Sequence, residues 1–339
     1  MRPFEFARVQ DSRAAIQAHA AGTGEAAAEM PTQYLAGGTT LLDLMKLDVM
    51  RPARIIDINA LQNAELGQIE AGPQGLRLGA LVRMSEAEGH AGIKEHFPVV
   101  AQSLQLAASA QLRNMASLGG NVLQRTRCSY FRDTSYEQCN KRIPGSGCAA
   151  LDGINRQHAV LGVSDHCIAS YPGDFAQALI ALDAEVEIGG PRGSRTMEFA
   201  ALHRPPGTTP EVETTLAPGE LITAFRVPAT PFARRSLFLK IRDRESYEFA
   251  LASAAVALDL DGDTVRQARI ALGGVATVPW RARDAEAHLK GKVLDDSAAA
   301  VAADKAFAQA SAREHNQFKI ELGKRTLIRA LRQAAAMEI

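Results

Sequence analysis

Residues 33–44 read Gln33-Tyr-Leu-Ala-Gly37-Gly38-Thr39-Thr40-Leu41-Leu42-Asp43-Leu44, which predicts a short strand that passes through paired glycines into a helix. We expect Thr39 to be the N-cap of that helix. Free backbone N–H groups point out of a helix start, and glycines let a phosphate approach the backbone closely. The segment therefore suits an anionic ligand. It is neither the GxGxxG fingerprint nor a P-loop, and such a turn alone more often only joins a strand to a helix.

A second loop of the same character lies further along the chain. Residues 113–122 read Arg113-Asn-Met-Ala-Ser117-Leu-Gly-Gly120-Asn121-Val122, with a hydroxyl, paired glycines and an amide ahead of an apolar segment. Two such loops on different subdomains would hold the two phosphates of a dinucleotide from either side.

The hydrophobic pattern divides the chain into three parts. Residues 1–60 alternate strands and helices, which predicts a small βαβαβ unit, and residues 61–229 predict a second, α+β subdomain. Residues 230–339 predict an antiparallel meander over 236–275 followed by three helices, which is a separate α+β domain. The expected strands outside the meander are 4–9, 33–36, 54–58, 75–81 and 184–188, and the expected helices are 12–21, 39–47, 99–110, 282–290, 297–312 and 320–335.

Composition excludes several classes of protein. The chain has 339 residues, of which 46% are hydrophobic, so it can bury a large core. Its 38 basic residues balance its 38 acidic ones, and no net field attracts nucleic acid or an anionic membrane surface. Neither a signal-peptide pattern nor a run of about 18 apolar residues is present. We expect a globular chain whose export would depend on another chain.

Four motifs in order resemble the FAD-binding subunits of the xanthine dehydrogenase and carbon monoxide dehydrogenase family of molybdenum hydroxylases. They are Ala-Gly-Gly-Thr-Thr-Leu at 36–41, Asn-x-Ala-Ser-Leu-Gly-Gly-Asn at 114–121, Pro-Gly-Glu-Leu-Ile at 218–222 and Leu-Lys-Ile-Arg-Asp-Arg at 239–244. The resemblance implies an α+β protein with two domains. Residues 1–229 would form an FAD-binding fold of the vanillyl-alcohol oxidase (PCMH) type, and residues 230–339 a domain like the C-terminal part of the carbon monoxide dehydrogenase flavoprotein.

The resemblance also assigns FAD contacts. The two glycine loops would lie on either side of the pyrophosphate, Asp174 would lie near the adenosine portion, and Leu221 and Ile222 would line the flavin region. Lys240 would reach the isoalloxazine, where a cation stabilises the negative charge that a reduced flavin carries near N1. Read alone, Lys240 is a solvated strand lysine. The expected contacts are Gln33, Tyr34, Leu35, Ala36, Gly37, Gly38, Thr39, Thr40, Leu41, Ser117, Gly120, Asn121, Asp174, Leu221, Ile222 and Lys240.

All the cysteines fall in one polar insertion, at about residues 122–170. They are Cys128, Cys139, Cys148 and Cys167, separated by ten, eight and eighteen residues. A disulfide framework is typical of small secreted domains, so a metal or a cluster is the better interpretation here. The spacing matches neither a ferredoxin run nor a zinc ribbon, and it leaves a zinc site and an iron–sulfur cluster equally open.

Charge moderately favours the cluster, because cations and amide donors stabilise negatively charged sulfurs. The turn at 144–147 would expose N–H groups beside Cys148. The insertion also resembles that of the FAD subunits of bacterial periplasmic aldehyde oxidoreductases, which implies a [4Fe–4S] cluster on the four cysteines. His158 and His166 are then expected to be hydrogen-bonding loop residues, not ligands. The cationic residues of the insertion are Arg125, Arg127, Arg132, Lys141, Arg142 and Arg156.

The resemblance implies an electron-transfer subunit of a molybdenum-dependent aldehyde oxidoreductase, which converts an aldehyde and water to a carboxylate. Electrons would pass from the [2Fe–2S] clusters of a small subunit to FAD and on to an external acceptor, such as a ferredoxin-like protein. A large subunit would hold the molybdenum cofactor, and no catalytic residue is expected in this chain. The implied compartment is the periplasm, by co-export with a signal-bearing partner, or otherwise the cytoplasm. Two alternatives stay open: a stand-alone flavin oxidase or reductase of the same superfamily, and a zinc protein on this scaffold.

Overall fold

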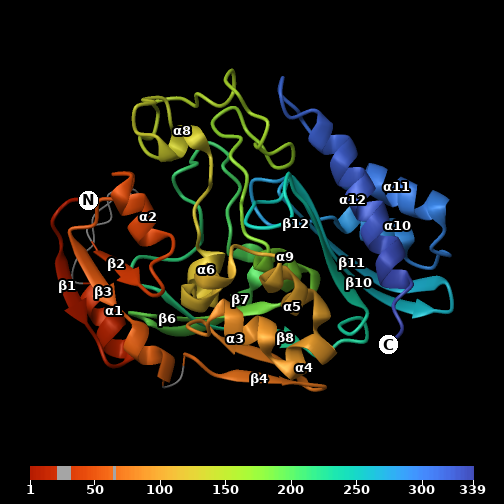
Figure 1. Ribbon diagram of the computed structural model, residues 1–339, viewed down its shortest axis with the longest axis horizontal. Helices are drawn as coiled ribbons and strands as arrows, with labels where there is room; N and C mark the ends of the chain where they lie inside the picture. The colour runs from red at the N-terminus through yellow and green to blue at the C-terminus, as the bar shows by residue number, and fades with distance from the viewer. Residues whose placement is uncertain (21–31, 64–65) are drawn as a thin grey trace.

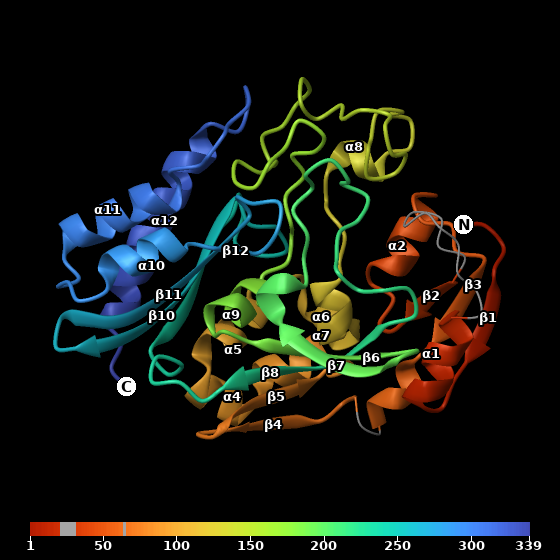
Figure 2. The same ribbon diagram turned by 180° about the vertical axis from the view of Figure 1, so that it is seen from behind.

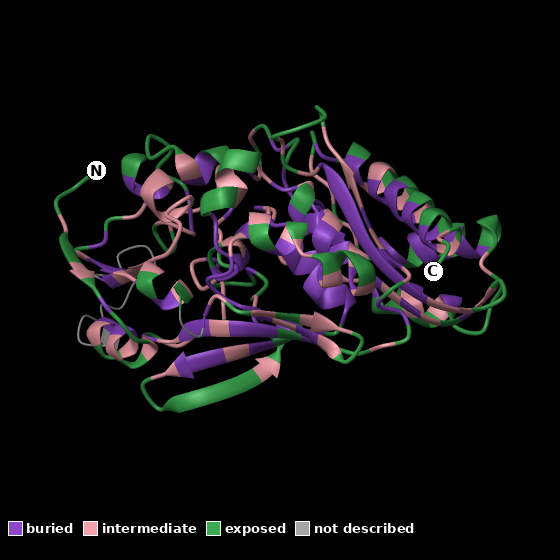
Figure 3. Cartoon of the chain, turned by 60° about the horizontal axis from the view of Figure 1, so that its bottom comes forward, coloured by how far each residue is buried: buried purple, intermediate pink, exposed green. Residues whose placement is uncertain are grey.

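The computed structural model describes residues 1–20, 32–63 and 66–339, and it arranges them around three β-sheets (Figure 1). Figure 3 shows that buried residues gather where helices meet sheets, whereas the outer helical faces are exposed. Among the described residues, no helix combines the length and the apolar character that crossing a membrane requires.

The first sheet is small and parallel, with strand order β1–β3–β2, which confirms the expected βαβαβ unit. Its central strand contributes the fully buried Ile55 and Ile56. The expected end of the first helix, residue 21, lies outside the described residues. The elements are β1 (Glu5–Arg8), α1 (Ser12–Ala20), β2 (Thr32–Leu35), α2 (Leu41–Lys46) and β3 (Arg54–Asp57).

The start of α2 differs from the expectation. The helix begins at Leu41 and its N-cap is Thr40, whose side chain makes no capping hydrogen bond, so the assignment of Thr39 as N-cap is wrong. Gly38 adopts φ +73°, and the N–H of Leu42 already bonds to the Gly38 carbonyl at 3.1 Å. The left-handed glycine turns the chain into the helix without a side-chain cap.

The second subdomain is an antiparallel sheet of order β4–β5–β8–β6–β7, covered by short helices. The expected helix over 99–110 is interrupted, because Ala108 adopts φ +50° and Ser109 caps a new helix. The strands are β4 (Ile69–Gly72), β5 (Gly75–Gly79), β6 (Glu185–Gly190), β7 (Gly193–Glu198) and β8 (Leu221–Pro228). The helices are η1 (Asn59–Asn63), α3 (Met84–Gly89), α4 (Ala91–His96), α5 (Pro98–Gln105), α6 (Ala110–Met115), α7 (Leu118–Val122), α9 (Phe175–Ala181) and η2 (Phe199–Ala201).

The cysteine insertion has little regular structure. Its one helix is α8 (Ser129–Arg132), and three isolated β-bridges within it or at its edge involve Cys139 with Cys148, Ser164 with Cys167, and Leu161 with Ala276. Both ribbon views show the insertion above the second subdomain, between α2 on one side and the C-terminal helices on the other (Figures 1 and 2).

The C-terminal domain contains the expected meander and three helices, with a short fourth strand that the sequence pattern did not indicate. Residues 252–258 of the central strand are all buried, because helices of both domains contact that strand. The elements are β9 (Ser236–Ile241), β10 (Ala252–Asp261), β11 (Thr264–Gly273), β12 (Trp280–Arg281), α10 (Arg283–Leu289), α11 (Asp296–Ala306) and α12 (Phe318–Ala335).

Candidate functional site

A cavity of about 350 Å³ lies where the subdomains and the insertion meet, and both glycine loops line it. Four expected contacts are absent from its lining: Leu35, Asn121, Asp174 and Lys240. The twelve expected contacts that line it are Gln33, Tyr34, Ala36, Gly37, Gly38, Thr39, Thr40, Leu41, Ser117, Gly120, Leu221 and Ile222.

The two glycine loops touch through their backbones. A Cβ atom on Gly37 would lie 1.8 Å from the carbonyl oxygen of Met115, so only glycine allows this approach. In the second loop, Ser117 is the N-cap of α7 and its hydroxyl accepts from the N–H of Gly120 at 3.2 Å. The Ser117 side chain is 1% exposed, so its main effect is to fix the loop that faces the cavity.

Asp174 and Lys240 pair with each other instead of lining the cavity. The Nζ of Lys240 donates to Asp174 Oδ2 at 2.7 Å and to the carbonyl of Leu106 at 3.1 Å, and the two side chains are 4% and 1% exposed. Burial raises the pKa of Asp174, although the Lys240 charge opposes the rise. A solvated Lys240 is thus excluded. A carboxylate buried at the start of α9 requires a cation, and β9 supplies it.

A partly buried ion cluster lies at one side of the cavity, and the sequence did not indicate it. Glu213 accepts from Arg125 Nε at 2.6 Å and from Lys141 Nζ at 2.7 Å, and all three residues line the cavity. Burial alone would raise the pKa of Glu213, but the two cations lower it to about 2. These partners are 88 and 72 residues apart in the chain, so no local pattern could reveal the cluster.

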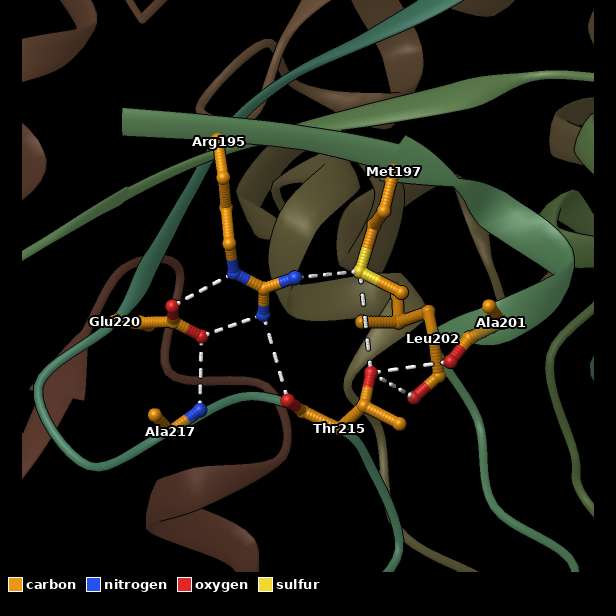
Figure 4. Close-up of polar contacts among 7 residues, drawn as sticks. All are labelled: Arg195, Met197, Ala201, Leu202, Thr215, Ala217 and Glu220. Carbon is orange, nitrogen blue, oxygen red and sulfur yellow. Dashed lines mark hydrogen bonds and ion pairs between the residues drawn. The ribbon is translucent and has the colours of Figure 1, made fainter. Parts of the chain in front are cut away.

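The loop that follows Glu213, residues 214–220, is bound to strand β7 of the second sheet (Figure 4). Arg195 of β7 donates to Glu220 Oε1 at 2.8 Å and to Oε2 at 2.7 Å, and the N–H of Ala217 donates to Oε2 at 2.8 Å. The hydroxyl of Thr215 donates to the carbonyl of Ala201 at 3.0 Å. These bonds hold residues 214–220 as one wall of the cavity.

An aromatic pair lies beside the second glycine loop. The hydroxyl of Tyr171 and Nε2 of His203 both donate to the carbonyl of Val122, at 2.9 and 3.1 Å. Their rings meet edge to face with centroids 4.8 Å apart. Burial lowers the pKa of His203 to about 4, so its ring is neutral and contributes no charge to the cavity lining.

The four cysteines are free thiols that the insertion brings into one neighbourhood. Cys139 and Cys148 face each other in an antiparallel bridge, and Cys128 packs against the hydrophobic cluster that contains Cys139 and, with Cys148, against a second one. The thiols of Cys148 and Cys167 interact, and this interaction lowers the pKa of Cys148 and raises that of Cys167. Among the described residues, no group of three or more His, Cys, Asp or Glu side chains forms a site for a metal ion.

Backbone N–H groups lie beside the cysteines. Those of residues 130 and 131 act to lower the pKa of Cys128, and those of 150, 151 and 168 act to lower the pKa of Cys148. The N–H of Ala169 lies 3.4 Å from Cys167 Sγ, and His158 Nε2 lies 3.1 Å from Cys128 Sγ. In the 144–147 turn, the N–H of Gly147 donates to Asn140 Oδ1 at 2.9 Å and that of Ser146 donates to the Ile143 carbonyl at 3.1 Å, so neither is directed at Cys148.

Most cations of the insertion attach it to the rest of the chain. Arg127 and Arg132 both donate to Asp43 of α2, at 3.3 and 2.8 Å. Arg142 donates to carbonyls within the insertion, and Arg156 pairs with Asp243 at 2.8 Å. The charge of Lys141 acts to lower the pKa of Cys167, against the raising effects of Cys148 and burial.

The C-terminal domain holds the other end of the insertion. Lys319 of α12 is 0% exposed, and its Nζ donates to the carbonyls of Gln157, His158 and Gly274 at 3.1, 3.1 and 2.7 Å. Asn316 donates to the Ala159 carbonyl at 3.0 Å. Burial lowers the pKa of Lys319 to about 7.

Comparison with known proteins identifies the fold and the family. Residues 2–230 match the FAD binding domain in molybdopterin dehydrogenase, and residues 238–334 match the CO dehydrogenase flavoprotein C-terminal domain. The chain is 47% identical to the aldehyde oxidoreductase FAD-binding subunit PaoB of Escherichia coli K12, over 90% of this chain and 92% of that one. It is 27% identical to the glyceraldehyde dehydrogenase medium chain of Sulfolobus acidocaldarius, over 78% of this chain and 75% of that one.

Solved structures of carbon monoxide dehydrogenases have the same fold over nearly the whole chain. A carbon monoxide dehydrogenase from Hydrogenophaga pseudoflava superimposes with a TM-score of 0.76 at 26% identity, over 99% of this chain and 98% of that one. A Cu,Mo-CO dehydrogenase gives a TM-score of 0.75 at 23% identity, over 99% of each chain, and shares the fold. The expected α+β fold with an FAD-binding domain and a flavoprotein C-terminal domain is confirmed. The chain therefore belongs to the family of FAD-binding subunits of the molybdenum hydroxylases, and it is an oxidoreductase subunit of such a multisubunit complex.

Proposed function

We propose that this chain is the electron-transfer subunit of a molybdenum-dependent aldehyde oxidoreductase, and that it carries a [4Fe–4S] cluster on its four cysteines beside FAD. One observation carries the proposal: the cysteine centre and the cavity adjoin. The N–H of Ala169 points at Cys167 Sγ, and Ala169 and Ser170 themselves line the cavity. Two electron carriers at these positions would be close neighbours.

Different residues of the cavity would contact different parts of FAD. The backbone at Gly37 and Gly38 leaves room for a pyrophosphate, and the Ser117 loop faces it from the other subdomain. Leu221 and Ile222 supply an apolar wall from β8. Bound FAD supplies the exchange of one or two electrons, and the protein orients it and shields it from water. Asp174 and Lys240 would act through the wall of the site, by joining α9 to β9.

The donor set around the cysteines fits an iron–sulfur cluster. Amide N–H groups aimed at cysteine sulfurs stabilise the negative charge of cluster thiolates. The N–H of Ala169 lies 3.4 Å from Cys167 Sγ, and neighbouring backbone N–H groups favour the thiolate forms of Cys128 and Cys148. In such a cluster each of the four thiolates would bind a different iron, so the cysteines would not need to converge on one ion, as they would in a zinc site.

The relatives support the assembly that we propose. Two of them are named as an aldehyde oxidoreductase subunit and as the medium chain of a glyceraldehyde dehydrogenase. A large subunit would oxidise the aldehyde with water at molybdenum, and a small subunit with two [2Fe–2S] clusters would deliver electrons to this chain. The final acceptor would be an external protein such as a ferredoxin. The complex would reach the periplasm through the signal of a partner subunit.

Anaerobic purification of the full chain, alone and co-expressed with both partner subunits, tests the proposal. We expect about four irons, four sulfides and one FAD per chain. Zinc in place of iron would support the zinc-scaffold alternative. Rapid turnover of an alcohol or aldehyde by the isolated chain would refute the subunit role and support a stand-alone flavin enzyme. Fractionation of cells that express the whole complex would test the compartment.

A further inference from the structure

Arg125 stands between the cavity and the cysteine insertion, and most of its hydrogen-bonding capacity is unused. Its Nε donates to Glu213 at 2.6 Å, and its side chain is 10% exposed. Both terminal amino nitrogens, Nη1 and Nη2, are buried and have no hydrogen-bond partner among the residues that the structure describes. A buried guanidinium with four unused N–H donors is costly, so its presence indicates that a ligand supplies the acceptor.

Within residues 1–20, 32–63 and 66–339, no acceptor lies within hydrogen-bonding reach of Nη1 or Nη2 of Arg125. Its guanidinium lies 4.6 Å from the centre of the Phe131 ring, an apolar surface. The carboxylate of Glu213 is shared, because its other oxygen accepts from Lys141 at 2.7 Å. The three charged groups therefore carry a net charge of plus one at the cavity wall.

Among the described residues that line the cavity, the Lys and Arg side chains are Arg125, Lys141 and Arg204. Lys141 is bound by Glu213 and by the carbonyl of Pro210 at 3.0 Å, and Arg204 is exposed to solvent. Arg125 is therefore the buried cation on this wall whose donors remain available to a ligand.

We propose that Arg125 binds the pyrophosphate of FAD through Nη1 and Nη2. The pyrophosphate carries two negative charges, and the planar guanidinium fork matches two phosphate oxygens at once. The position agrees with this part of the cofactor. Arg125 follows Gly120 by five residues, and the Phe131 ring beneath it packs with Leu44 of α2, the helix that begins after the Gly37–Gly38 turn.

The proposal adds a role to the insertion. The insertion contributes a counter-charge to the FAD site, in addition to carrying the cysteines. The two glycine loops offer backbone dipoles and neutral hydroxyl groups to the phosphates, whereas Arg125 offers a full charge on a side chain that is 10% exposed. The inference rests on FAD binding in the cavity, and it does not depend on the identity of the group at the cysteines.

The test measures ligand affinity of the full chain in its co-expressed complex, after removal of the flavin. Arg125→Lys keeps one charge for Glu213 but removes the fork, and Arg125→Gln removes the charge. Fluorescence titration with FAD, ADP and riboflavin then separates the pyrophosphate from the isoalloxazine. We expect both variants to bind FAD and ADP about 10- to 100-fold more weakly, and riboflavin within about threefold of wild type.

Arg127→Lys is the matched control, because Arg127 is also in the insertion and pairs with a carboxylate, Asp43, but does not line the cavity. We expect it to bind all three ligands like wild type. Unchanged FAD and ADP affinities in both Arg125 variants would overturn the proposal. So would an equal loss of riboflavin, or a loss confined to Arg125→Gln, which would mean that a point charge suffices. A wild-type chain that binds no FAD would instead refute the FAD site itself.

Discussion

The glycine-loop cavity and the cysteine insertion share a wall but are held in place by different contacts. The cavity loops are the ends of regular elements, and their backbones touch where Gly37 meets Met115. The insertion has one helix of four residues, and ion pairs and single hydrogen bonds to α2 and α12 hold it. The first region is defined by short-range geometry that tolerates no added atom. The second depends on distant partners and, we propose, on its cluster.

The largest effect should follow from adding atoms where the two loops touch. Gly37→Val places a side chain 1.8 Å from the Met115 carbonyl, so the loops must separate. We expect FAD affinity to fall at least about 100-fold, measured by flavin content and titration. Gly72→Ala is the control, since a Cβ there meets no atom within 4 Å. Equal flavin in both variants would show that the loops do not form the FAD site.

The next change separates the two regions directly. Cys139→Ser removes one proposed ligand while leaving the glycine loops intact. We expect iron to fall from about four to below about one per chain, while FAD content falls less than about threefold. Metal analysis and flavin absorbance of the same sample provide both numbers. Full iron in the variant would exclude Cys139 as a ligand, and parallel loss of FAD would show that the regions are not separable.

The hydrogen bonds of Lys319, which join α12 to the insertion and which we call the Lys319 clamp, should contribute to stability. Lys319→Met removes the donor to the carbonyls of His158 and Gly274, while the Gln157 carbonyl keeps the Ser170 hydroxyl at 3.0 Å. We expect the free energy of unfolding to fall by about 2–4 kcal/mol in urea denaturation. Lys324→Met on the same helix removes only an exposed pair with Asp304, for an expected change below about 1 kcal/mol. Similar changes in the free energy of unfolding for the two variants would mean that the cost of burying the Lys319 charge cancels the gain from its hydrogen bonds.

Acid should weaken the ion cluster at the shared wall. The pKa of Glu213 is about 2 in the folded chain and 4.5 ordinarily, so its contribution to stability is full above about pH 4.5 and is lost as the pH falls toward 2. With its side chain 25% exposed, we expect about 1–2 kcal/mol. Glu213→Gln should flatten the stability curve over this interval. An unchanged slope would place the acid-sensitive group elsewhere.

The smallest effect concerns a surface pair that joins the insertion to the C-terminal domain. Arg156 and Asp243 are 46% and 45% exposed, and such pairs contribute little. We expect Asp243→Asn to change the free energy of unfolding by less than about 1 kcal/mol, with the difference vanishing in high salt. A larger change would indicate that Arg156 also depends on the pair to stay over the Phe318 ring.

The contrast between local geometry in the cavity loops and distant partners in the insertion explains what the sequence could predict. Strand and helix patterns predicted the βαβαβ unit and the meander, because both are specified by local periodicity. Paired glycines between a strand and a helix indicated the first loop, although not its N-cap. The Arg125, Lys141 and Glu213 cluster was missed, because charged residues in a loop have no pattern that identifies their partners. Lys240 could not be placed either, since its burial follows from domain packing.

The Lys319 clamp also implies an order of biosynthesis. Residues 155 and 158 find their partners in residues 315 and 319, about 160 residues later in the chain. The glycine loops can meet while the chain is still emerging from the ribosome, because domains generally fold as units from the N-terminus. The insertion can form its contacts with residues 315 and 319 only after α12 has been synthesised. We therefore expect the cysteines to stay accessible throughout translation, so that any cluster is loaded onto a finished chain.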